Sequence, residues 1–387
     1  MTEAVETQKA AESSLRHSPL EEAQRRAGAS LVERDGCIVA ANYGDWRAEY
    51  EAVRGGACAG LFDLSTRGRV EVSGAEAVPF LNGMLTNDVA ALKEGEWMRA
   101  AFPNPQGRLI ATARVFRTPE GFIFDTEAAT YAPVLKSLER FTLAGDFRVR
   151  DLTRETATVS VQGARAREIV RAVLGEAAAT TARGRFTVAR FQVEKVAVVR
   201  ATHTSEDGFD VFVPAPEAGS LWNALKASGA RPAGSDALEV LRVEAGIARY
   251  GVDASDANVV LEVVNEEEAV SYTKGCYVGQ EIIARIHWRG HVAKRLAGLI
   301  FDREVETPAG ARVRSCADVG REVGRITSSV FSPRLRRQIA LALIKYDHLA
   351  AGTKVEIFDG DAELCAAHVA ELPMVRGGWH AEAELEQ

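Results

Sequence analysis

The segment whose residues point most clearly to a chemical function is YTKGCYVGQEIIARIHWRGH, residues 272–291. Cys276 stands between two glycines, two residues after Lys274, and helical spacing begins at Gln280. An ammonium group and the positive end of a helix both stabilise a thiolate, so we expect the pKa of Cys276 to lie below the free value of about 8.5. Cys276 and Lys274 are therefore candidate catalytic residues. The alternative is that the glycines form a tight loop in which Cys276 fills a hole.

Two other segments carry charged groups that could bind a ligand. Asp210 lies in EDGFDVFVP, residues 206–214, an otherwise apolar stretch with the pattern of a strand. A carboxylate there either faces water or hydrogen-bonds an amidine-like edge of a ligand. Arg242 and Glu244 are two residues apart and cannot share a helix face, so one could point into a cleft while the other packs or pairs locally. The alternative is an ordinary salt-bridged helix end.

The cysteines and histidines predict no metal site. The five cysteines are odd in number and widely spaced, with no CxxC, which disfavours disulfides, a zinc site and an iron–sulfur cluster. His287 and His291 could join Cys276 around a metal only if Gly290 did not end the helix between them. Motifs for nicotinamide binding, P-loops, zincins and α/β-hydrolases are missing as well.

The composition is that of a globular protein with several cores. The chain has 387 residues, 47% hydrophobic and 26% charged, which predicts two or three domains. Its 47 basic and 54 acidic residues give a net charge of −7, so we expect no direct nucleic-acid partner. No apolar run is long enough to span a membrane, and the N-terminal residues are polar. We therefore expect a cytoplasmic protein without membrane contact.

The hydrophobic pattern indicates paired strands alternating with helices. Residues 108–117 (RLIATARVFR) and 121–126 (GFIFDT) are expected to form a hairpin, and residues 280–289 a helix. From residue 291 onward, five or six short strands separated by Gly, Pro and Asp turns predict a closed antiparallel barrel. Strands that arrive in adjacent pairs favour an α+β fold with antiparallel sheets over a parallel doubly wound sheet.

We divide the chain into five parts on this basis. Residues 1–34 are expected to be a flexible arm and residues 374–387 a loose tail. Residues 35–145 and 146–290 form two αβ subdomains, the second including KGCYVGQE, and residues 291–373 form the barrel.

These segments together resemble a known superfamily. GLFDLSTRGRVEVSGAEAVPFLNGMLTNDV (residues 60–89), EDGFDVFVP, LRVEAGIARYG and KGCYVGQE are similar to the folate-binding superfamily of the glycine-cleavage T protein. Within it, KGCYVGQE with the following ARIHWRG most resembles the YgfZ branch, the tetrahydrofolate-dependent iron–sulfur assembly factors. The resemblance extends from about residue 35 to residue 372.

The resemblance implies a fold and a ligand. It implies two folate-binding subdomains and a barrel around a central hole that binds tetrahydrofolate or a one-carbon derivative. A carboxylate and an arginine then hold the pterin, and the matching positions are Asp210 and Arg242. Asn87 in TNDV and Tyr250 after LRVEAGIAR are further candidates for the same pocket.

The sequence departs from the T proteins where they carry acidic residues. The DxSH motif of that branch is represented by Asp63-Leu64-Ser65 followed by Thr66, and its paired aspartates by Ala111 and Thr112. Without a carboxylate there, no residue is evident that could act as general acid or base at the folate nitrogens. We therefore expect this chain not to replace a T protein.

Three functions follow as hypotheses. The first is a tetrahydrofolate-binding protein that assists iron–sulfur cluster assembly or repair, and indirectly tRNA modification, through a reactive Cys276. Its partners would be iron–sulfur enzymes or assembly factors. The alternative is a folate-dependent aminomethyltransferase, like the T protein, or a demethylase. The third is a folate-binding module without turnover, in which Cys276 is structural.

Overall fold

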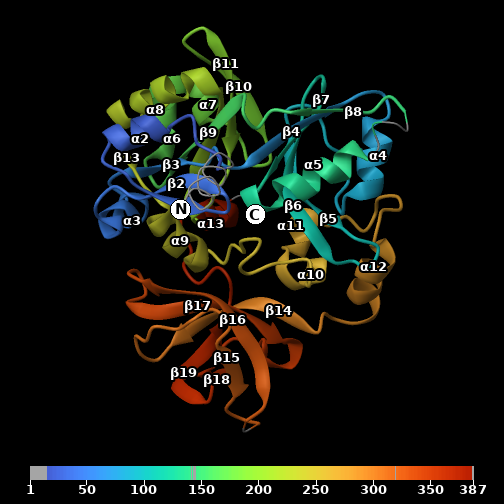
Figure 1. The fold of residues 1–387 in the computed structure, drawn as a ribbon, viewed down its shortest axis with the longest axis vertical. Helices are drawn as coiled ribbons and strands as arrows, with labels where there is room; N and C mark the ends of the chain where they lie inside the picture. The colour runs from blue at the N-terminus through green and yellow to red at the C-terminus, as the bar shows by residue number, and fades with distance from the viewer. Residues whose placement is uncertain (1–14, 141, 143–144, 319, 386–387) are drawn as a thin grey trace, which may run out of the picture.

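The computed structural model describes residues 15–140, 142, 145–318 and 320–385. The chain forms two sheets side by side, with a barrel beneath both of them (Figure 1). The α+β fold with antiparallel sheets and a C-terminal barrel is confirmed. Among the described residues, no helix combines the length and the apolar character needed to cross a bilayer.

The first sheet has six strands in the order β10-β11-β12-β9-β3-β13. Neighbouring strands are antiparallel except β13, which runs parallel to β3. The amphipathic helices α6 and α8 place their apolar residues on this sheet, so that its core is formed on that face. The elements are β3 (Ala59–Asp63), β9 (Thr156–Gln162), α6 (Ala166–Leu174), α7 (Glu176–Ala179), β10 (Phe186–Phe191), β11 (Glu194–Arg200), β12 (Gly208–Pro214), α8 (Ala218–Ala227) and β13 (Ala230–Pro232).

The second sheet has five antiparallel strands in the order β5-β6-β7-β4-β8. Its core lies between the strands and two helices, α4 and α5. The hairpin expected at residues 108–126 is present as β6 and β7. The elements are β4 (Gly68–Ser73), α4 (Ala77–Met84), β5 (Trp97–Pro103), β6 (Leu109–Arg117), β7 (Gly121–Thr126), the 3₁₀ turn η1 (Ala128–Thr130), α5 (Tyr131–Glu139) and β8 (Arg148–Asp151).

The C-terminal strands close into a six-stranded barrel in the order β14-β17-β16-β15-β18-β19. Its interior is filled by alternating aliphatic side chains. The strands are β14 (Lys294–Phe301), β15 (Arg312–Ser315), β16 (Glu322–Ser332), β17 (Arg337–Lys345), β18 (Lys354–Asp359) and β19 (Ala362–Ala370).

Helices and short segments connect these three parts. Helix α9 packs between the six-stranded sheet and the barrel, and α10 and α11 lie between the five-stranded sheet and the barrel (Figure 1). Helix α12 lies at the outer edge of the five-stranded sheet, against the β5–β6 turn (Figure 1). The remaining elements are α2 (Glu21–Arg26), β1 (Ser30–Arg34), β2 (Cys37–Asn42), α3 (Trp46–Arg54), η2 (Ala215–Glu217), α9 (Ser235–Glu244), α10 (Val260–Val263), α11 (Glu266–Ala269), α12 (Gln280–Arg289), η3 (Tyr346–His348) and α13 (Gly378–Leu385).

The two sheets interleave along the chain, which differs from our sequential division. Strand β3 lies within residues 35–145, yet it pairs with β9 and β13 of the other sheet. A boundary near residue 145 therefore does not separate the sheets. Local hydrophobic pattern shows that a strand exists, but it does not show with which distant strand it pairs.

Both chain ends are packed more closely than the sequence indicates. Of the expected arm, residues 1–14 lie outside the described residues, but Leu20 is fully buried in the core of the six-stranded sheet. Ser18 Oγ and Gln24 Nε2 donate hydrogen bonds to Asp63 at 2.5 and 2.7 Å. At the other end, the expected loose tail is anchored because the Val375 amide donates to the Glu244 carbonyl. The described residues of both segments therefore pack on the fold.

Candidate functional site

A cavity of about 1250 Å³ lies where the two sheets, helix α9 and the barrel meet. Strands β5 and β6 contribute Trp97 and Thr112, helix α9 contributes Arg242, and β14 contributes Leu296. The central hole that the resemblance implies is thus present. Every part of the fold supplies some of its wall.

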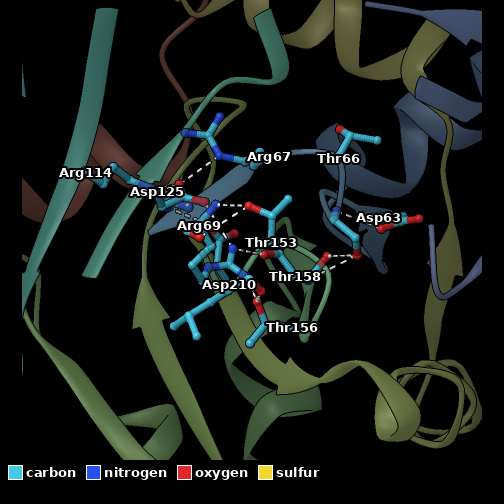
Figure 2. A network of polar contacts seen from close by, with 12 residues as sticks. Asp63, Thr66, Arg67, Arg69, Arg114, Asp125, Thr153, Thr156, Thr158 and Asp210 are labelled. Atoms are coloured by element: carbon cyan, nitrogen blue, oxygen red, sulfur yellow. Dashed lines mark hydrogen bonds and ion pairs between the residues drawn. The ribbon is translucent and has the colours of Figure 1, made fainter. Parts of the chain in front are cut away.

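The wall on the side of β6 is built on a buried network of charges (Figure 2). Arg114 of β6 and Asp125 of β7 face each other directly in the strand register. Asp125 accepts hydrogen bonds from Arg67 Nε at 2.8 Å, Arg69 Nη2 at 3.1 Å and Arg114 Nε at 2.8 Å. Burial alone would raise the pKa of Asp125, but these three arginines hold it well below its usual range.

Asp210 extends this network into the six-stranded sheet. Its carboxylate accepts a hydrogen bond from Arg114 Nη1 at 2.5 Å, and His203 Nε2 lies 2.9 Å away on the other side. Burial would raise the pKa of Asp210, but His203 and Arg114 hold it far below its usual range. Asp210 itself is fully buried and is not among the residues that line the cavity, whereas Arg114 and His203 are. The structure therefore places Asp210 behind the wall, where it orients two groups that face the cavity.

Arg242 lines the cavity but is already fully engaged. Its guanidinium donates to Glu239 at 2.5 and 2.9 Å, to Asp253 at 2.7 Å and to Ser328 Oγ of the barrel at 2.7 Å. This arrangement fastens helix α9 to the barrel. Glu244 points elsewhere and accepts from Tyr50 and Arg54, so the two charged residues separate as their spacing indicates.

Tyr250 lines the cavity, whereas Asn87 does not. The Asn87 amide nitrogen donates to the carbonyls of Arg99 and Glu268, at 2.8 and 3.0 Å. Its side chain therefore closes a loop beside strand β5. Of the four residues matched to the pterin pocket, the structure brings Arg242 and Tyr250 to the cavity and places Asn87 and Asp210 outside its lining.

Lys274 and Cys276 also lie outside the cavity lining. Lys274 Nζ donates to the carbonyls of Leu85 and Asn87, both at 2.8 Å. Burial lowers the pKa of Lys274 to about 8. Cys276 is exposed, and helix α12 begins four residues later, so the catalytic roles of both residues stay predictions.

The glycine that precedes α12 has a packing role. Gly279 has a φ of 78°, and a Cβ there would meet the Asn104 carbonyl oxygen at 2.5 Å. Only glycine allows α12 to approach the β5–β6 turn so closely. Much of the KGCYVGQE string is therefore explained by how this segment docks on the five-stranded sheet.

Arg114, which lines the cavity, and its buried partner Asp125 were not among the site residues predicted from the sequence. Arg114 and Asp125 lie inside the apolar strands RLIATARVFR and GFIFDT, which is the same signal that drew attention to Asp210. Glu127, at the end of GFIFDTE, also lines the cavity. These charges could have been found by applying to every strand the criterion applied to residues 206–214.

The fold and cavity define a class of protein in which two αβ sheets and a barrel enclose one large central site. Comparison with known proteins shows which family this is. The family model of the GCVT N-terminal domain matches residues 20–266, and that of the glycine cleavage T-protein C-terminal barrel domain matches residues 294–376. The chain belongs to the glycine cleavage T-protein family.

Curated relatives match over most of their length. An aminomethyltransferase of Rubrobacter xylanophilus is 35% identical, covering 86% of this chain and 88% of its own. Aminomethyltransferases of Burkholderia multivorans and Thermotoga neapolitana are 33% and 31% identical, over 94% and 95% of this chain and 98% and 100% of theirs. A crystal structure of the glycine cleavage system aminomethyltransferase T from Bartonella henselae superposes with a TM-score of 0.85, at 24% identity over 94% of this chain and 99% of that one, which shows a shared fold.

These relatives correct our first functional hypothesis. They are named aminomethyltransferase and not YgfZ, so the iron–sulfur role, its client proteins and the link to tRNA modification are not supported. They favour the alternative, and they count against our expectation that aminomethyl transfer is excluded. The hypothesis gave too much weight to one short string, whose Lys274 and Gly279 serve local packing. The tetrahydrofolate cofactor is supported by the family.

Proposed function

We propose that this protein is a folate-dependent aminomethyltransferase that moves a one-carbon unit between an amine-bearing donor and tetrahydrofolate in the central cavity. The observation that carries the proposal is the cavity itself, enclosed by all parts of a fold shared with aminomethyltransferases. Pockets for one drug-sized ligand measure about 300–1,000 Å³. The volume of about 1250 Å³ leaves room for a folate and part of a second substrate.

The residues of the cavity fit a folate. Trp97 and Tyr250 offer aromatic surface for a planar ring. Trp97 Nε1 and Arg249 Nε are buried atoms that have no hydrogen-bond partner among the described residues, so both can donate to a ligand. Arg67 and Arg99 also line the cavity and suit the carboxylates of a glutamyl tail. When bound, tetrahydrofolate supplies the nitrogen that receives the one-carbon unit.

The buried network favours an anionic ligand in this cavity. Three arginines, Arg67, Arg69 and Arg114, share two carboxylates, Asp125 and Asp210, in the hydrogen-bonded cluster. Because this cluster has an excess of positive charge and little access to water, it attracts negative charge at the wall. Ion pairs with Asp125 and Asp210 fix the Arg114 side chain, so it can bind a ligand without changing its conformation.

The finer placement of the chain beside the YgfZ branch rests only on the strings KGCYVGQE and ARIHWRG. It adds no iron–sulfur function to the proposal.

The test is a direct assay of group transfer. The protein is mixed with tetrahydrofolate and an aminomethylated lipoyl carrier whose one-carbon unit is labelled with ¹³C, and the folate is followed by NMR. We expect the label to appear as methylene-tetrahydrofolate in proportion to enzyme. If the folate stays unlabelled while a known aminomethyltransferase labels it under the same conditions, the proposal is wrong.

A further inference from the structure

The β6–β7 hairpin carries two successive cross-strand pairs whose side chains point to opposite faces of the sheet. Arg114 faces Asp125, and Ala113 faces Thr126, in the register of the two strands. Glu127 keeps an extended backbone, with φ −63° and ψ 154°, so the alternation continues one residue beyond β7. Thr112 and Glu127 are therefore the next facing pair on the Arg114 side, and both line the cavity.

The two carboxylates of this face have different surroundings. Asp125 is held by three arginines, whereas Glu127 Oε2 accepts one hydrogen bond, from the Tyr250 amide at 3.0 Å. Glu127 forms no ion pair with any described residue, and its Oε1 has no hydrogen-bond partner among them. Burial raises the pKa of Glu127 above its ordinary value, even though Arg67, Arg242 and Arg249 act in the opposite direction. Carboxylates whose environments separate their pKa values in this way commonly divide acid/base work between them.

The charged groups around Glu127 are directed at other partners. Arg67, between β3 and β4, donates to Asp125. Arg242 of α9 and Arg249 from the following loop both bind Glu239 of α9. Because each neighbouring cation is paired with a carboxylate other than Glu127, none locks Glu127 in its ionised state.

Other carboxylates of the cavity wall are less suited to exchange a proton. Glu239 and Glu268 are paired with arginines. Asp63 accepts hydrogen bonds at both oxygens, from Ser18, Gln24 and the Ser65 amide. Glu127 differs from these three because one oxygen is anchored and the other faces no protein donor.

We propose that Glu127 is the proton carrier of the reaction, and this role rests on the function proposed above. Glu127 takes the proton from the tetrahydrofolate N–H as that nitrogen bonds to the one-carbon unit. It then delivers the proton to the donor atom X that leaves. The N–H and C–X bonds break, the N–C and X–H bonds form, the bonding pair of C–X departs with X, and Glu127 ends ionised as it began. No oxidant or reductant is needed.

The test compares Glu127→Gln with Glu120→Gln, which removes an exposed carboxylate from the turn of the same hairpin, outside the cavity lining. The first measurement is the Kd for tetrahydrofolate between about pH 5 and 8. We expect the wild type and Glu120→Gln to bind more tightly as pH rises, because an ionised Glu127 accepts from the N–H, and Glu127→Gln to lose this dependence. The second measurement is the transfer rate, which should fall about 10²–10⁴-fold in Glu127→Gln and stay unchanged in the control.

A carboxylate on the facing residue supplies a rescue experiment. In the double variant Thr112→Asp/Glu127→Gln, we expect the transfer rate to rise at least tenfold above that of Glu127→Gln. Thr112 is the position opposite Glu127 when the β6–β7 register is extended by one residue beyond Ala113 and Thr126. If Glu127→Gln transfers at the wild-type rate, or keeps the wild-type pH dependence of Kd, the role of Glu127 is wrong while the proposed function stands. If the wild type neither binds tetrahydrofolate nor transfers the unit, the proposed function fails and this role with it.

Discussion

Arg114 of β6 and Asp210 of β12 join the two sheets through an ion pair at 2.5 Å in which the side chains are 4% and 0% exposed. The same arginine also binds Asp125 at 2.7 Å within its own sheet. Buried charges are costly unless each has a partner, so the three side chains depend on one another. The pairing fixes how the sheets meet at the cavity wall, next to the Phe116 and Phe212 rings that pack between them.

We predict that Asp210→Asn destabilises the fold by about 3–5 kcal/mol, because it leaves Arg67, Arg69 and Arg114 to share the single carboxylate of Asp125. Urea unfolding followed by circular dichroism measures this. The matched control is Asp361→Asn, which breaks an Arg–Asp pair whose carboxylate is fully exposed and should leave the unfolding midpoint unchanged. Equal changes in the free energy of unfolding would show that the buried network stabilises the fold no more than an exposed ion pair does.

Asp125 should make the protein sensitive to acid. Its pKa is far below its usual range in the folded state, whereas an unfolded chain titrates near pH 3.9. The stabilisation is therefore complete above about pH 4 and is lost as pH falls through the folded-state pKa. Thermal unfolding between about pH 2.5 and 7 should show a steep loss of stability below pH 4 that is shallower in Asp125→Asn. Parallel curves for the two proteins would contradict this assignment.

Trp97 should contribute a hydrogen bond to folate. Trp97→Phe keeps an aromatic ring but removes the unpaired Nε1–H, so the Kd for tetrahydrofolate should rise about 2–12-fold, as for one lost hydrogen bond. Trp288→Phe changes a tryptophan that is 70% exposed and outside the cavity lining, and should leave the Kd unchanged. Isothermal titration calorimetry distinguishes the two. An unaltered Kd in Trp97→Phe would show that Trp97 Nε1 donates no hydrogen bond to folate.

Cys276 should react first with iodoacetamide. Cys276 and Cys316 are exposed, whereas Cys37 and Cys365 are buried, and burial raises the pKa of Cys316 and brings that of Cys365 to about 11. Labelling at about pH 7 with site assignment by mass spectrometry checks the order. Because Cys276 lies outside the cavity lining, tetrahydrofolate should not change its rate. Slower labelling of Cys276 than of Cys316 would contradict the prediction.

The elements that the sequence analysis placed correctly depend on local pattern. The β6–β7 hairpin follows from a turn between two strand-like runs, and α12 occupies Gln280–Arg289 as its spacing indicates. The barrel follows from short strands with turns between them. The pairing of β3 with β9, about a hundred residues later, is not encoded in any local period and was therefore missed.

The site shows the same difference between local features, which the sequence predicts, and long-range contacts, which it does not. Tyr250 and Arg242 line the cavity because helix α9 ends at its wall, and their contact with folate stays a prediction. The position of Asp210 behind that wall could not be predicted, because its partner Arg114 lies 96 residues away in another sheet. Sequence spacing can identify a buried carboxylate, but it cannot show whether a ligand or a distant arginine satisfies it.

The central claim, that the cavity is the folate site, is tested most directly by calorimetric titration with tetrahydrofolate of the wild type, Ala248→Trp and Ala317→Trp. Ala248 lines the cavity, whereas Ala317 lies on an exposed loop of the barrel. We predict one folate per chain in the wild type and in Ala317→Trp, and at least tenfold weaker binding in Ala248→Trp, because the indole fills the space that the ligand needs. The account is contradicted if the wild type binds no tetrahydrofolate, or if Ala248→Trp binds it as tightly as the wild type.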